Sequence, residues 1–168
     1  MSFSIYEATL PPMMRLLHNL GAILDKAKAQ AATKGMALEE LVEARLAPDM
    51  HPFKRQIQIA SDAAKGCAAR LSGSEAPSFP DTEQTFDELR QRITKTLDYL
   101  KSFKPAQFDG AEDRHIVIKT PHRNFEMNGR DFATGYALPN VFFHVTTAYG
   151  LLRHKGIEIG KADYLGSN

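Results

Sequence analysis

A long segment without charged residues constrains this chain more than any other feature. Between Phe132 and Leu152 the sequence contains no Asp, Glu, Lys or Arg. Such a segment is usually buried, but Asn, His, Thr, Gly and Pro interrupt it too often for a membrane-spanning helix. Pro139 suits the first position of a helix, and an Arg-His-Lys run before Gly156 suits its last turn. The sequence therefore predicts a helix over residues 139–155.

This predicted last helix carries two neighbouring stripes of side chains, given about 100° of rotation per residue. The apolar stripe consists of Val141, Val145, Ala148 and Leu152. The second stripe is mostly polar and consists of Asn140, His144, Thr147, Leu151 and His154. Polar groups on an uncharged helix either satisfy hydrogen bonds inside the core or line a small-molecule pocket. In the second case, Gln56 and Asp62 of an earlier helix are the expected residues on the opposite side.

Helical periodicity predicts three further long helices, over residues 4–32, 52–71 and 81–104, and a short one over 37–45. Asp81 is the predicted N-cap of the third long helix, with Gln84 completing a capping box. Residues 116–119 and 124–127 are short and alternating, which is typical of a small β-hairpin. Four long helices with short connections predict a mostly α protein, an antiparallel four-helix bundle in one domain over residues 1–168.

Composition excludes several classes of function. The net charge is +1 and charged residues make up 24% of the chain, so no electrostatic footprint for nucleic acid or an anionic membrane is present. The single cysteine, Cys67, rules out an internal disulfide framework and is expected to be a small buried hydrophobe. No secretory signal, phosphate-binding loop or nucleophile elbow is found. We therefore expect a cytoplasmic protein without nucleic-acid or membrane partners.

Recognisable motifs occur along nearly the whole chain. In the last third they are Leu138-Pro-Asn-Val-Phe-Phe-His-Val-Thr-Thr-Ala-Tyr149, Leu152-Arg-His-Lys-Gly156 and Gly160-Lys-Ala-Asp-Tyr-Leu-Gly166. Further upstream they are Leu46-Ala-Pro-Asp-Met50, Arg55-Gln56 with Ala60 and Asp62, and Pro77-Ser-Phe79 with Asp81-Thr-Glu83. These residues resemble a family of bacterial proteins known only as a domain of unknown function. That family looks like an outlying branch of the DinB-like (YfiT-like) four-helix bundles, which agrees with the helix count.

The resemblance implies a divalent metal, zinc or nickel, held by one histidine of the second helix and two of the last helix, four residues apart. It also implies thiol-dependent transferase or isomerase chemistry and a homodimer. Phe142 and Tyr149 lie on the side of the last helix away from the polar stripe, where they either pack inside or form an interface. His154 matches the second histidine of the last-helix motif, and Gly150 stands where the first would be. His51 is the candidate on the second helix. Gly150 leaves one of the three positions without a donor, and His51 stands before Pro52 at the very start of the second helix, so the implied metal site is incomplete.

Two functional hypotheses follow from this departure. The first is a metal-free small-molecule-binding or interaction protein, with Asn140, His144, Thr147, His154, Gln56 and Asp62 as pocket candidates. The alternative is a divalent-metal-dependent thiol transferase or hydrolase, with His154, His51 and a carboxylate such as Asp62 or Asp49 as ligands. His144 does not replace the missing ligand, because ten residues of helix place it about 15 Å from His154 and zinc–nitrogen bonds are roughly 2 Å long. The sequence leaves open whether the protein is an enzyme.

Overall fold

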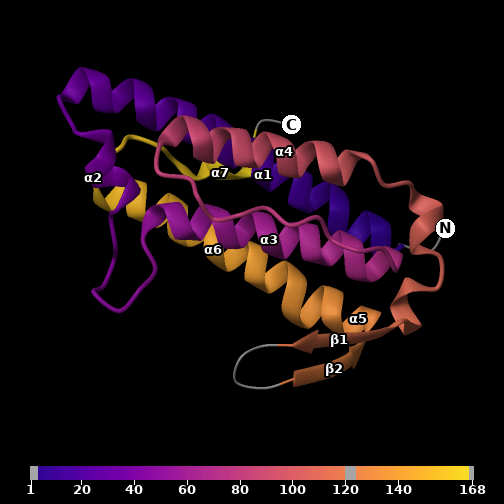
Figure 1. The fold of residues 1–168 in the computed structure, drawn as a ribbon. Coiled ribbons are helices and arrows are strands. Elements are labelled where there is room, and N and C mark those ends of the chain that lie inside the picture. The colour runs from indigo at the N-terminus through magenta and orange to yellow at the C-terminus, as the bar shows by residue number, and fades with distance from the viewer. Residues whose placement is uncertain (1–3, 120–123, 167–168) are drawn as a thin grey trace.

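Four long helices lying side by side form the body of the protein in the computed structural model, which describes residues 4–119 and 124–166 (Figure 1). They are α1 (Ile5–Lys34), α3 (Phe53–Ser72), α4 (Phe86–Lys101) and α6 (Leu138–His154). Helix α3 packs against α6 and α4, and α1 packs against α4 and α6. The mostly helical fold expected from the sequence is confirmed.

Shorter elements connect the long helices and cover their ends. They are α2 (Leu38–Val42), two 3₁₀ turns (Pro105–Phe108 and Ala111–Asp113), α5 (Gly129–Asp131), a π-helical segment (Phe132–Ala137) and α7 (Lys161–Leu165). An antiparallel hairpin of β1 (His115–Lys119) and β2 (Asn124–Asn128) pairs Ile116 with Met127 and Ile118 with Phe125. Figure 1 shows this hairpin at the end of the bundle where α3 ends and α6 begins. The predicted small hairpin is therefore present.

Burial of apolar side chains follows the predicted helical stripes. Leu17, Ile57 and Val141 are among the completely buried residues of three different helices, and Cys67 is buried with them. Burial raises the pKa of the Cys67 thiol to about 12, so this residue is a hydrophobe and not a thiolate nucleophile. Within the described residues, none of the helices combines the length and the apolar character that crossing a membrane requires.

The two largest departures from the predicted helix boundaries are both at helix starts. The first is the start of α4, where Thr85 is the N-cap and Glu88 completes the capping box, so the predicted cap at Asp81 is wrong. The carboxylate of Asp81 is instead paired with Arg55 and Arg92. The second place is the last helix, which α5 and the π-helical segment extend backwards, because the Asn128 side chain caps the chain at Asp131. Residues 129–137 thus join α6 as one helical unit.

Candidate functional site

A pocket of about 480 Å³ lies between α3, the inner strand β1 of the hairpin and the helical unit that leads into α6. Four of its lining residues are charged at neutral pH: Arg55, Asp62, Arg70 and Lys119. The other lining residues are Ile59, Ala63, Ile118, Phe132, Tyr136, Ala137 and Asn140. A pocket of this size with apolar walls and a few convergent polar groups is typical of a small-molecule site.

Helix α3 supplies most of the charged lining. Arg55, Ile59, Asp62, Ala63 and Arg70 follow one another at helical spacing and therefore form one continuous face. The guanidinium of Arg70 lies over the ring of Phe132, with its Cζ atom 5.9 Å from the ring centroid. This contact directs Arg70 toward the π-helical segment, so that α3 and the segment enclose the pocket together.

The π-helical segment explains how the opposite wall is made. Its wider turns, spanning Phe132–Ala137, break the 3.6-residue spacing just before α6 begins. Phe132 is buried and stacks on Tyr136, with 6.0 Å between the ring centroids, and Asn140 follows one turn later. Local π-helical turns are often found at functional sites because they re-aim side chains. The segment and the first turn of α6 therefore place Phe132, Tyr136 and Asn140 in the wall opposite α3.

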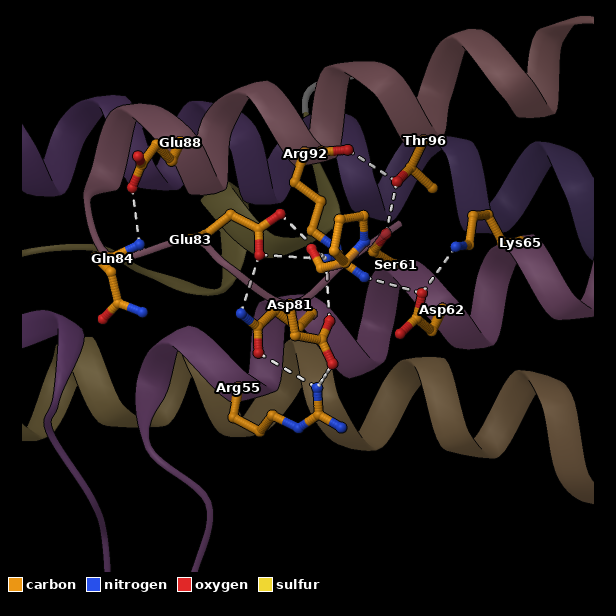
Figure 2. Close-up of polar contacts among 12 residues, drawn as sticks. Arg55, Ser61, Asp62, Lys65, Asp81, Glu83, Gln84, Glu88, Arg92 and Thr96 are labelled. Atoms are coloured by element: carbon orange, nitrogen blue, oxygen red, sulfur yellow. Dashed lines mark hydrogen bonds and ion pairs between the residues drawn. The ribbon is translucent and has the colours of Figure 1, made fainter. Parts of the chain in front are cut away.

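Asp62 is held in the pocket wall by two buried cations (Figure 2). Its Oδ1 atom lies 2.9 Å from Nη2 of Arg92 and 2.9 Å from Nζ of Lys65. The Arg92 and Lys65 side chains are only 1% and 5% exposed, whereas that of Asp62 is 41% exposed. Buried cations are stable only when they are paired, so Asp62 is the partner that Arg92 and Lys65 require, and its position in the pocket wall is fixed by them.

The same ion cluster fixes the loop between α3 and α4. Arg92 also lies 3.0 Å from Asp81 and 3.1 Å from Glu83, and donates to the Pro80 carbonyl at 3.1 Å. Figure 2 shows Arg92 on α4 between this loop and Asp62 of α3. Because Arg55 is paired with Asp81, the loop in turn holds one of the cations of the pocket.

A second polar group joins α3 to α6 beside the pocket. Nδ1 of His144 lies 2.7 Å from Oε1 of Gln56, and Nε2 of Gln56 donates to the His51 carbonyl at 3.0 Å. Burial of the half-buried imidazole, followed by the nearby His51 and Arg55, lowers the pKa of His144 to about 4. His144 is therefore neutral at physiological pH.

The six pocket candidates from the sequence occupy different surroundings. Asp62 and Asn140 line the pocket, and Gln56 and His144 contact each other next to it. Thr147 donates to the Phe143 carbonyl within α6, and His154 is exposed at the end of that helix. The predicted polar stripe is thus divided along α6 and does not line one cavity.

The residues do not fit the metal site that the resemblance implies. Across residues 4–119 and 124–166, no group of three or more His, Cys, Asp or Glu side chains is arranged to hold a metal ion. His51 acts electrostatically on His144, which is ten residues before His154 in α6. Gly150 offers no donor and lines a separate shallow hollow with Phe142 and Phe143. The structure therefore does not assemble His51, His154 and a carboxylate into one site.

Sequence reasoning missed the cations of the pocket. Arg55, Arg70 and Lys119 were not candidates, although the helical spacing of Arg55, Asp62 and Arg70 was a usable signal. Arg92 was also missed, since an arginine next to Leu89 and Ile93 on an apolar face is the sign of a buried ion pair. No local pattern in the sequence indicates that Ile118 and Lys119 of β1 line the pocket, because tertiary contacts determine where the hairpin packs.

The chain is similar to known proteins along nearly its whole length. A family model described as a domain of unknown function, DUF1993, matches residues 5–165. A crystal structure of a DinB family member protein from Shewanella denitrificans is 45% identical, with a TM-score of 0.90. The match covers 97% of this chain and 92% of that chain. No curated protein matches.

Proposed function

Because the chain belongs to the DUF1993 family, a DinB-like family of unknown function, we propose its function from the pocket itself: it binds a small organic anion between α3, β1 and the π-helical segment. The observation that carries this proposal is the excess of cations at the pocket. Arg55, Arg70 and Lys119 line it, whereas its one carboxylate, Asp62, is already neutralised by Arg92 and Lys65.

Two of these cations are available to a ligand. Arg55 is shared with Asp81, but within the described ranges neither Arg70 nor Lys119 lies within ion-pair distance of a carboxylate. Arginine binds carboxylates and phosphates through two parallel N–H donors, which gives both affinity and orientation. Ile59, Ala63 and Ala137 add apolar wall for the hydrocarbon part of the ligand. The site therefore suits a compact organic acid, and the metal-dependent alternative gains no support from the positions of His51 and His154.

The first prediction concerns Arg70. We expect a panel of C3–C8 mono- and dicarboxylates and phosphate monoesters to contain compounds that raise the melting temperature and bind in calorimetric titration. Replacing Arg70 with glutamine should raise the dissociation constant of such a compound about tenfold or more, because a charge-assisted hydrogen-bonded pair is lost. Arg90→Gln is the matched control, since Arg90 pairs with Asp25 away from the pocket. Binding that survives both Arg70→Gln and Arg55→Gln, or the absence of any binding compound, contradicts the proposal.

We also propose a second copy of the chain as the macromolecular partner. Leu46, Phe142, Phe143 and Leu165 are large apolar residues that are 38–56% exposed. Phe142 lines two hollows, one beside Leu165 and one beside Leu46 and Phe143, so these residues form one continuous apolar surface. Glu7 and Arg15 line the first hollow together. A twofold arrangement can place Glu7 of one copy against Arg15 of the other, which makes the surface complementary to itself.

The second prediction concerns this apolar surface. Phe142→Lys is expected to shift a dimer to monomer, with at least a tenfold higher dissociation constant in sedimentation velocity, because a charge replaces an interface aromatic. Tyr149, the other interface candidate, packs edge-on against Tyr164 and is partly covered. Val117→Lys is the control, since Val117 is similarly exposed on β1. A monomeric wild-type protein at 100 μM would refute the assembly.

A further inference from the structure

A chain of two hydrogen bonds fixes which ring nitrogen of His144 carries its proton. The His51 carbonyl can only accept, so the amide group of Gln56 that lies 3.0 Å away must be the NH₂ group. The amide oxygen then faces Nδ1 of His144 at 2.7 Å, and this oxygen can only accept as well. Nδ1 must therefore be the protonated nitrogen. Since a neutral imidazole carries one N–H, Nε2 has a free lone pair.

The free nitrogen of His144 belongs to a ring that is only half-buried. Among the described residues, no hydrogen bond to Nε2 of His144 is present. In this part of the chain, Nε of Arg92 is the one fully buried side-chain polar atom without a partner. Nε2 of His144 also lacks a partner but is not in that group, so it is not completely buried. Gln56, in contrast, is only 2% exposed, and its orientation is fixed by the packing of α3 against α6. The structure thus leaves a lone pair of fixed tautomer on a half-buried ring, without a hydrogen-bond partner among the described residues.

The position of His144 relates this lone pair to the pocket. His144 follows Asn140 by one turn of α6, and Asn140 lines the pocket together with Arg55. The charge of Arg55 is close enough to act on the imidazole. His144 is not itself a lining residue, but it lies one turn beyond Asn140 and close to Arg55, and so next to the pocket. Arg55 contacts Asp81 and Gln58 through Nη1, so an anionic group bound by its remaining N–H groups would place its neighbouring substituent toward the imidazole.

We propose that His144 is the hydrogen-bond-accepting residue of this site and that its Nε2 atom accepts a hydrogen bond from a hydroxyl or ammonium group next to the anionic group of the ligand. The organic anion is then a hydroxy acid or an amino acid, and this assignment rests on the proposed anion pocket. Gln56 is the positioning residue, because it holds His144 in the Nδ1–H form.

The charge state of His144 agrees with this role. Burial is the main cause of its lowered pKa, and His51 before α3 and Arg55 on α3 add to the effect. Its contacts from α3 and α6 are the neutral amide of Gln56 and the edge-on ring of Phe143, 5.1 Å away. None of these groups stabilises the imidazolium form. The lone pair is therefore present across the physiological pH range.

The third prediction tests the lone pair without any ligand. Diethyl pyrocarbonate ethoxycarbonylates only unprotonated imidazole nitrogens, and peptide mass spectrometry gives the rate for each histidine. With a pKa of about 4, His144 should react at pH 5.5 within twofold of its rate at pH 7.5. N-acetylhistidine in the same tube should slow by on the order of tenfold, because its pKa is about 6.5. A tenfold fall for His144, or no modification of it at either pH, overturns the proposal.

Gln56 variants separate positioning from a merely structural role. Gln56→Glu keeps an acceptor at Nδ1 but adds a charge that favours the imidazolium, so the His144 rate at pH 5.5 should fall several-fold. Gln56→Leu removes the acceptor, and ¹⁵N NMR should show the Nε2–H tautomer, which is absent in the wild-type protein. A wild-type spectrum with the proton on Nε2 refutes the assignment. Failure of the anion panel with a correct tautomer would instead refute only the ligand class, so the two proposals fail separately.

Discussion

Replacing Arg92 with methionine is expected to lower the free energy of unfolding by about 3 kcal/mol or more, which is the loss measured when one partner of a buried ion cluster is removed. The Arg92 side chain is 1% exposed and lies within 3.1 Å of Asp62, Asp81 and Glu83. Methionine retains the apolar stem, so that the change mainly removes the charge. Among the described residues, the three carboxylates would then keep Lys65, Arg55 and Gln58 as partners.

The measurement is urea unfolding together with the melting temperature. A loss of this size in a chain of 168 residues corresponds to a decrease of roughly 6–12 °C. Arg90→Met is the control, because Arg90 forms a mostly exposed pair with Asp25, and such pairs contribute about 0–1 kcal/mol. Equal effects of the two substitutions would show that the Arg92 cluster does not hold the loop. If the Arg92 cluster holds the loop, Arg92→Met should also weaken anion binding, because the cluster fixes Asp62 and Arg55.

The sequence predicted the helices because their signals are local. The apolar spacing of α3 and the glycine after it determine Phe53–Ser72, and cations before Gly156 mark the end of α6. The start of α4 was misplaced for a reason that local signals do not contain. Asp81 has the right chemistry and spacing for a cap, but Arg92, eleven residues later, and Arg55, on another helix, bind its carboxylate. These two ion pairs, which join residues distant in the sequence, therefore outweighed the local preference of Asp81 for the cap position.

The candidate site was predicted only in part, and the reason is geometric. His144 and Gln56 were both candidates, and the structure brings them to 2.7 Å because α3 and α6 pack side by side. The polar stripe was drawn for a regular helix, and His154 falls outside the pocket because it is ten residues further along the same axis. The π-helical segment before α6 has no sequence signature, yet it is what turns Tyr136 toward Arg70. Assigning helix faces from the rotation of a regular α-helix, about 100° per residue, therefore cannot identify the residues of a pocket that depends on such a segment.

Gly129→Ala is expected to lower the free energy of unfolding by about 3 kcal/mol, at the upper end of overpacking effects. Gly129 is buried at the start of α5. A Cβ atom there would overlap the carbonyl oxygen of Ala111 and come within 2.9 Å of its carbonyl carbon. Leu71 lies on the other side, with Cδ2 3.2 Å from the added atom. The obstacle is backbone of a buried residue, so a side-chain rotation cannot relieve it.

This substitution also tests how the pocket is built. Gly129 seats the helical unit that carries Phe132 and Tyr136, so a shift of its start should displace both from Arg70. Gly150→Ala is the matched control, because no atom lies within 4 Å of an added Cβ there, and alanine in a helix is favoured by up to about 1 kcal/mol. In urea unfolding, a lower free energy of unfolding for Gly129→Ala and a higher one for Gly150→Ala would support the tight contact with Ala111. A neutral Gly129→Ala with unchanged anion binding would mean that the unit can move without opening the pocket.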